Sequence, residues 1–201
     1  MRQVTVRQES WPLRGVFSIA RGSLTEITVV VVEIREGQSV GRGECRPYPR
    51  YGETPQGVIA DIKALVPALE AGMEREALNA LLAHGAARNA IDCALWDLSA
   101  KRTGQPVWQL AGLTAPQPLT TAYTLSVDTP ANMADAAVKA ARRPLLKLKL
   151  AGLGDLERVA TVRSNAPGVR LIVDANEAWT LSDKGSTDFL SPSIINPTTY
   201  P

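Results

Sequence analysis

The N-terminal part of the chain alternates between polar and apolar residues, or runs apolar with β-branched side chains, as β-strands do. QVTVRQES (3–10) alternates, EITVVVVEIR (26–35) is rich in valine and isoleucine, and SVGRGEC (39–45) follows a turn at Glu36 and Gly37. This pattern predicts a three-stranded meander.

A helical pattern follows these strands. Thr54 and Pro55 are typical of the first positions of a helix, and apolar residues then recur every three or four residues. A second helix is predicted over 75–82 and a third over 86–102, which Gly104 would end. Strands followed by helices indicate an α+β unit.

After residue 118 the strands and helices alternate. Strand-like segments cover 120–126, 145–150 and 169–175, and the helices between them are predicted to begin at Thr129 and Asp155. A β-α-β-α-β order almost always produces parallel strands with right-handed crossovers. The sequence therefore predicts a second, parallel sheet whose faces are covered.

Two lysines in the segment PLLKLKLAG (144–152) are expected to share one face of a strand in this sheet. Taken alone, the alternation of leucine and lysine describes a strand with one dry and one wet face. In a closed barrel the leucines would face the helices, so Lys147 and Lys149 would face the interior near the carboxyl end of their strand. Asp174 ends the next parallel strand. We therefore expect the two amines and the carboxylate to meet at the same mouth.

This combination of groups suggests a particular chemistry. Two ammonium groups close together in a low-dielectric pocket disfavour each other's charge, so that one of them can accept a proton near neutral pH. A carboxylate at the adjacent strand end is suited to a hard divalent cation, which would stabilise the oxyanion of a deprotonated carbon acid. The sequence thus predicts proton abstraction next to a carboxylate.

Composition and charge argue against a nucleic-acid-binding, membrane-spanning or secreted protein. With 45% apolar residues, 21% charged residues and a net charge of +2, the chain shows no basic face of the kind that nucleic acid requires. The longest valine run is cut short by Glu33, so no apolar stretch reaches the roughly 20 residues that cross a bilayer. The N-terminus lacks the apolar middle of a secretion signal.

The two cysteines and the histidine give no sign of a metal site or a disulfide. Cys45 and Cys93 form no C-x-x-C pair, which indicates a reducing cytoplasm and argues against zinc. His84 is expected to have a structural or solvent role.

Several longer motifs resemble a known family. The pair KLK (147–149) followed by VDAN (173–176), and preceded by NAIDCALWDLSAKRTGQPVWQLAGL (89–113), is similar to the mandelate racemase and muconate lactonizing branch of the enolase superfamily. More narrowly, IARGS (19–23) and GECRPYPRYGE (43–53) resemble the dipeptide epimerases that interconvert L-Ala-D-Glu and L-Ala-L-Glu.

The resemblance implies roles for five residues. Lys149 matches the acid/base that removes or returns the α-proton, and Lys147 matches the lysine that binds the substrate carboxylate. Asp174 matches the first of three carboxylates that bind Mg²⁺. Arg21 matches the arginine that meets the acidic end of the dipeptide, and Thr124 matches a substrate-contacting threonine. The implied function is Mg²⁺-dependent dipeptide epimerisation in murein-peptide recycling, in the cytoplasm, with no nucleic-acid or membrane partner and with room for a homo-oligomer.

The resemblance also implies the fold. Residues 1–115 match an α+β N-terminal capping domain, and residues 116–181 match the first three strands of a (β/α) TIM-type barrel. Because such a barrel needs about 250 residues, we expect it to be incomplete. Residues 182–201 are rich in Ser, Thr, Pro and Asn and leave the family pattern, so we expect an aberrant tail, for which a shifted reading frame is favoured over a truncation.

An incomplete barrel would have three consequences. The second lysine of a two-base epimerisation would be missing, so the chain is expected to be inactive. A single carboxylate would hold Mg²⁺ weakly. Exposed strand edges and apolar faces would make the chain poorly stable or prone to associate with itself.

Some assignments stay open at this level. Tyr48, Tyr51 and Glu53 lie where such proteins carry a loop that closes over the site, without individual roles, and Asn176 is expected to orient Asp174 rather than to bind the metal. The chain could instead resemble another superfamily enzyme, such as a muconate cycloisomerase or an o-succinylbenzoate synthase relative. A third interpretation is a noncatalytic remnant that serves as a structural or interaction module.

Overall fold

The fold is described from a computed structural model, which covers residues 1–180. The chain divides into two compact units, one made of Met1–Pro12 and Glu26–Gln117 and the other of Leu13–Thr25 and the chain from Pro118 onward. The aberrant tail predicted at 182–201 lies outside the described residues. The domain boundary predicted near residue 115 stays a prediction.

The first sheet has the predicted three strands in the order β1-β2-β3. The strands are β1 (Arg2–Ile19), β2 (Gly22–Glu36) and β3 (Ser39–Cys45). β2 and β3 pair antiparallel, with Val30 opposite Cys45 and Glu36 opposite Ser39. The three-stranded meander is therefore present.

β1 and β2 are longer than their sequence patterns indicated. The sequence predicted strands at 3–10 and 26–35, where residues alternate or run apolar. In the structure, cross-strand contacts continue along the hairpin, including Ser18 Oγ to Ser23 Oγ at 2.7 Å. Arg21 consequently lies in the tight turn between β1 and β2.

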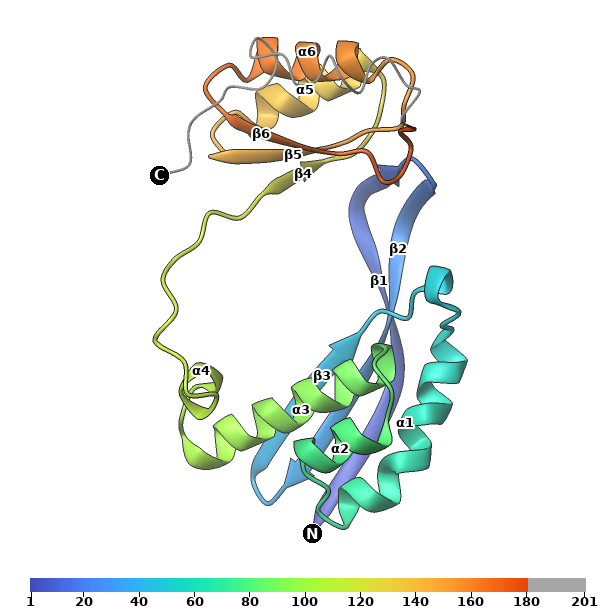
Figure 1. Cartoon of the computed structure of the whole chain (residues 1–201), viewed down its shortest axis with the longest axis vertical. Coiled ribbons are helices and arrows are strands. Elements are labelled where there is room, and N and C mark those ends of the chain that lie inside the picture. The colour runs from blue at the N-terminus through green and yellow to red at the C-terminus, as the bar shows by residue number, and fades with distance from the viewer. Residues whose placement is uncertain (181–201) are drawn as a thin grey trace. The chain divides into compact units, whose positions relative to one another are not determined.

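Three helices pack on one face of the first sheet (Figure 1). They are α1 (Pro55–Glu70), α2 (Arg75–Leu81) and α3 (Ala86–Thr103), followed by the short α4 (Val107–Leu110). The Thr54 side chain accepts a hydrogen bond from Gly57 N, and α3 ends at Gly104 with φ of 69°, as the sequence predicted. α4 was not predicted, because a single turn leaves no periodic pattern. The core between the first sheet and α1, α2 and α3 comprises Val30, Val32, Ile34, Cys45, Val58, Ile62, Leu69, Leu78, Ala87, Ala90, Ile91, Ala94, Leu95 and Leu98.

α3 lies unusually close to β3, and two glycines allow it. A Cβ atom on Gly43 would stand 1.9 Å from the Ala90 carbonyl oxygen, and one on Gly41 would stand 2.1 Å from the Ala94 carbonyl oxygen. Neither position has room for a side chain. The sequence SVGRGEC thus fixes how closely the helix approaches the strand.

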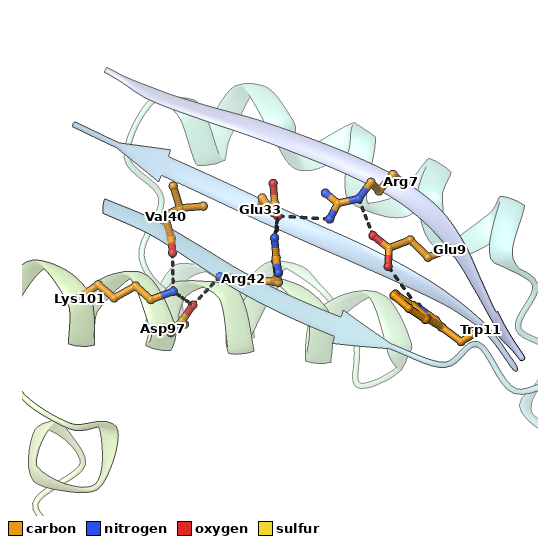
Figure 2. A network of polar contacts seen from close by, with 8 residues as sticks. All are labelled: Arg7, Glu9, Trp11, Glu33, Val40, Arg42, Asp97 and Lys101. Carbon is orange, nitrogen blue, oxygen red and sulfur yellow. Dashed lines mark hydrogen bonds and ion pairs between the residues drawn. The ribbon is translucent and has the colours of Figure 1, made fainter. Parts of the chain in front are cut away.

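α3 also supplies hydrogen bonds to the free edge of β3 (Figure 2). The Asp97 carboxylate accepts a hydrogen bond from Arg42 N at 2.7 Å. Lys101 Nζ donates to the Val40 carbonyl oxygen and to Asp97 Oδ2, both at 2.7 Å. Two backbone groups with which an added strand could pair, Arg42 N and the Val40 carbonyl oxygen, are therefore already bonded.

A chain of ion pairs continues across the same sheet (Figure 2). Glu33 accepts a hydrogen bond from Arg42 Nε at 2.8 Å and lies 3.3 Å from Arg7, whose Nε lies 2.6 Å from Glu9. The two arginines hold the pKa of the Glu33 carboxyl below its usual value. These side chains come from all three strands and so connect them on one face.

The second sheet is parallel, in the order β4-β5-β6. Its elements are β4 (Tyr123–Leu125), α5 (Pro130–Ala140), β5 (Leu145–Lys149), α6 (Asp155–Asn165) and β6 (Arg170–Asp174). α5 and α6 cover the same face of the sheet (Figure 1). The predicted β-α-β-α-β order is confirmed, although the first strand is shorter than the predicted 120–126. None of the helices in residues 1–180 is long and apolar enough to span a membrane.

The leucines of β5 form the centre of the second core. Leu146 and Leu148, together with Leu150, are fully buried against apolar residues of both helices. The remaining core residues are Leu125, Met133, Ala137, Ala140, Val159, Val162, Ala166 and Val169. The predicted fold class, an α+β N-terminal domain followed by βα units of an incomplete barrel, is confirmed.

Candidate functional site

The two lysines lie on the face of the second sheet that the helices leave uncovered. Because side chains alternate along a strand, burial of the leucines in β5 places Lys147 and Lys149 on the opposite face. The register aligns Thr124 with Lys147, and Lys149 with Asp174. Four of the predicted site residues therefore lie on three neighbouring strands.

Both lysines contact the same carboxylate oxygen. Lys149 Nζ lies 2.7 Å and Lys147 Nζ 2.9 Å from Asp174 Oδ2. Asn176 N donates a hydrogen bond to the other oxygen, Oδ1, at 2.9 Å. The Lys149 side chain is only 10% exposed, whereas that of Lys147 is 34% exposed. Lys149 is thus the more enclosed of the two amines.

These contacts determine the protonation state of Asp174. Hydrogen bonds from Lys149 and then from Lys147 hold the pKa of the Asp174 carboxyl well below its usual value. The backbone N–H of Asn176 acts in the same direction, and partial burial acts against it. The carboxylate is therefore ionised at neutral pH.

Arg21 contacts the loop that follows Asp174. Its Nη1 donates a hydrogen bond to the Asn176 carbonyl oxygen at 2.6 Å and lies 3.5 Å from the Glu177 carboxylate. The hairpin around Arg21 is held by a hydrogen bond from Val127 N to the Ser18 carbonyl oxygen at 3.2 Å. The structure thus brings Arg21 to the loop after β6, where it contacts Asn176 and Glu177.

The residues of the predicted closing loop belong to the other unit. Glu53 accepts hydrogen bonds from Tyr48 N at 2.9 Å and from Ala86 N at 2.7 Å, so its carboxylate holds this segment to the start of α3. The rings of Tyr48 and Tyr51 lie 5.7 Å apart. Together with His84, which is exposed, they line a pocket of about 540 Å³.

One buried carboxylate at the second sheet was missed by sequence reasoning. Asp155, the first residue of α6, is 2% exposed and accepts four hydrogen bonds, including one from the Trp179 indole. An acidic residue at the start of a helix has a common explanation in the helix dipole. The contact with Trp179, 24 residues away, leaves no local signal in the sequence.

The oxygen atoms at the strand end match part of a site for a hard cation. Asp174 offers a carboxylate, and Asn176 Oδ1 is buried without a hydrogen-bond partner among the described residues. Oxygen ligands of this kind suit Mg²⁺. Residues 1–180 contain no group of three or more His, Cys, Asp or Glu side chains arranged to hold a metal ion. Asp174 and Asn176 Oδ1 are thus two candidate oxygen ligands for Mg²⁺ among the described residues.

Comparison with known proteins places these features in a family. Residues 1–112 match the N-terminal domain of mandelate racemase and muconate lactonizing enzymes. The L-Ala-D/L-Glu epimerase of Escherichia coli strain K12 is 50% identical over 181 residues, which make up 89% of this chain and 56% of that protein. The chain spans about half the length of the curated relatives that it matches.

Solved structures agree with this relationship. An enolase family member from Agrobacterium tumefaciens, with bound sodium and L-Ala-L-Glu, is 43% identical with a TM-score of 0.90, and the match covers 96% of this chain and 60% of that one. The dipeptide epimerase of Cytophaga hutchinsonii, complexed with Mg and D-Ala-L-Val, is 28% identical with a TM-score of 0.84 over 96% of this chain and 56% of that one.

Proposed function

Because the chain belongs to the mandelate racemase and muconate lactonizing enzyme family of the enolase superfamily, we propose that it carries one catalytic face of a Mg²⁺-dependent dipeptide epimerase. The substrates are L-Ala-D-Glu and L-Ala-L-Glu. The observation that supports this proposal is the convergence of two lysines on one carboxylate at the ends of parallel strands.

Lys149 is the acid/base of the proposed reaction. In its neutral form, Nζ takes the proton from the α-carbon of the substrate's glutamate, and the electron pair of the C–H bond passes into the adjacent carboxylate. Enclosure of the side chain supports this assignment, because a buried amine is shielded from water. Lys147, which is more exposed, binds the substrate carboxylate by charge.

Asp174 would hold the cation, with Asn176 Oδ1 as a second candidate ligand. When bound there, Mg²⁺ supplies charge stabilisation for the oxyanion that forms on the substrate. The contacts of Lys147 and Lys149 with Asp174 would have to give way to such an ion, at least in part.

Arg21 and Thr124 are proposed to contact the substrate. Arg21 is held at the strand-end loop by the Asn176 carbonyl oxygen, and an acidic side chain of the dipeptide would be a stronger, charge-assisted partner. Thr124 is aligned with Lys147 in the sheet, which places it on the strand next to the carboxylate-binding lysine.

The candidate site holds lysines of a single strand among the described residues, so the inactivity expected from the sequence applies to net epimerisation, and we propose that exchange of the α-proton remains. Inversion requires a second base across the substrate to return the proton.

The free thiols of Cys45 and Cys93 support a reducing cytoplasm as the location.

Deuterium exchange tests this function directly. L-Ala-L-Glu is incubated with the chain and Mg²⁺ in heavy water, and loss of the proton signal at the glutamate α-carbon is followed by NMR. We expect Lys149→Met to slow exchange by roughly 100-fold or more. Lys139→Met, which changes an exposed lysine of α5, is the matched control. Exchange that is absent from the wild type, or that is equal in both variants, would contradict the proposal.

A further inference from the structure

Asp155 is a buried carboxylate whose hydrogen bonds all go to groups near the candidate site. Its Oδ1 accepts from Ala151 N and from Arg158 Nη1, both at 3.0 Å. Its Oδ2 accepts from Gly152 N at 2.7 Å and from Trp179 Nε1 at 2.8 Å. Four donors leave no lone pair of this side chain free for another partner.

Three of these donors belong to two different strand-end loops, and the fourth, Arg158, lies in α6. Ala151 and Gly152 lie in the loop directly after Lys149, whereas Trp179 lies in the loop after Asp174. The backbone also links the two loops, because Leu150 N donates to the Asp174 carbonyl oxygen at 3.0 Å.

Arg158 extends the connection to a third loop. While bound to Asp155, its Nη1 donates to the Leu153 carbonyl oxygen at 2.8 Å, and its Nε donates to the Asp128 carbonyl oxygen at 2.9 Å. Asp128 lies in the loop after β4. The Asp155–Arg158 pair therefore contacts the loops that follow all three strands of the second sheet.

We propose that Asp155 is a positioning residue that fixes the loops after β5 and β6 relative to each other and so fixes the positions of Lys149 and Asp174 at the strand ends. A carboxylate with four donors in a 2%-exposed position resists rearrangement, because a donor that loses its partner there is left unsatisfied. This geometric role stands without a catalytic function. Its effect on proton transfer rests on the function proposed above.

The competing explanation is that Asp155 only stabilises the start of α6. The chain contains a matched control for this explanation, because Glu157 is also an acidic residue of the first turn of α6 but is exposed. Replacing either side chain by its amide removes one negative charge from the helix N-terminus. Only Asp155→Asn also disturbs the two loops.

The experiment measures how accessible the Lys149 amine is to reductive methylation, with the exposed Lys139 as the internal reference, by peptide mass spectrometry. In Asp155→Asn we expect Lys149 to be modified about tenfold faster, a factor that corresponds to about 1.4 kcal/mol. In Glu157→Gln the rate should stay within about twofold of the wild type. Equal rates in the wild type and Asp155→Asn would overturn the proposal.

Two further variants separate positioning from general stability. Val162→Ala weakens the packing of the fully buried α6 residue Val162 without touching the loops, so Lys149 should stay protected. Faster modification in Val162→Ala, to the same extent as in Asp155→Asn, would show that protection follows stability alone and would overturn the proposal.

Trp179→Phe removes a single hydrogen-bond donor to Asp155 and leaves α6 unchanged. It therefore tests the proposal even if Asp155→Asn does not fold. It should also speed modification of Lys149, and an unchanged rate would overturn the proposal.

Deuterium exchange into L-Ala-L-Glu provides a second readout on the same variants. We expect Asp155→Asn to lower the rate of exchange at saturating dipeptide while the dipeptide concentration at half-maximal rate changes little. If the wild type shows no exchange, the proposed function fails, but the accessibility of Lys149 still decides the positioning role.

Discussion

At the scale of single residues, the central feature is one carboxylate shared by two ammonium groups. Asp174 neutralises part of a positive cluster whose more enclosed member, Lys149, is 10% exposed. Sequence reasoning found all three residues, because the alternation in β5 and the rule that parallel strands end at the same edge are local patterns. It missed Asp155, whose role depends on contacts with a loop more than 20 residues away.

Removing the shared carboxylate should destabilise the second unit. Asp174→Asn keeps the shape but leaves the enclosed Lys149 ammonium group without its counter-ion, so we expect the free energy of unfolding to fall by about 1–3 kcal/mol. Urea denaturation measures this change. Asp135→Asn, which alters an exposed residue of α5, should have little effect. An equal loss in both variants would argue against the pairing.

The depressed pKa of Asp174 also predicts an acid dependence. A carboxyl whose pKa is lower in the folded than in the unfolded state contributes stability that is complete above its unfolded pKa of about 3.9 and is lost as the pH falls below it. The wild type should therefore lose stability more steeply than Asp174→Asn below about pH 4. Parallel acid titrations of the two chains, followed by circular dichroism, would test this expectation.

The two cysteines should differ in reactivity. Burial raises the pKa of the Cys45 thiol to about 11, and burial also raises that of Cys93, although its side chain is exposed. Because the thiolate is the reactive form, Cys93 should react with iodoacetamide at pH 8 at least about tenfold faster than Cys45 in the native chain. In urea the two rates should converge. Equal rates in the native chain would mean that Cys45 is not buried.

At the scale of elements, the close contact of α3 with β3 decides how the first unit packs. The helix rests on a strand that presents glycine at two positions, where an added Cβ would overlap helix carbonyl oxygens. The sequence predicted both elements, but it could not show that they touch through glycine, since glycine in a strand has several explanations. It also predicted β1 and β2 too short, because the cross-strand contacts that extend the hairpin, such as Ser18 Oγ to Ser23 Oγ, leave no alternating pattern in the sequence.

Gly43→Ala tests this contact. The new methyl carbon would lie 1.9 Å from the Ala90 carbonyl oxygen, so helix and strand must separate, and we expect a loss of about 3 kcal/mol in the free energy of unfolding. Gly15→Ala adds the same atom where no heavy atom lies within 4 Å, and it should be neutral or slightly stabilising. Thermal denaturation of both variants gives the comparison. A neutral Gly43→Ala would show that the helix can move away without cost.

At the scale of the whole molecule, residues 1–180 form two hydrophobic cores with no residue in common. Each is built from one sheet and the helices on one of its faces. The hairpin of β1 and β2 contributes residues to both units. Sequence reasoning anticipated the change from strands-then-helices to alternating elements, but not that the tip of an early hairpin groups with the later unit.

Two core variants show whether the units unfold separately. Ile62 and Leu148 are fully buried, one in each core, and replacing either by alanine should cost about 2–5 kcal/mol. Hydrogen exchange measured by mass spectrometry should then show faster exchange only in the unit that carries the substitution. Equal acceleration in both units, from either variant, would indicate a single cooperative structure.

The edge of β3 has a further consequence for the behaviour of the chain in concentrated solution. Open strand edges are where fibrils and runaway sheet-to-sheet polymers begin. At β3, an incoming strand would first have to displace the Asp97 and Lys101 side chains from Arg42 N and the Val40 oxygen. Precipitation of this chain by sheet growth is therefore expected to start elsewhere than at β3.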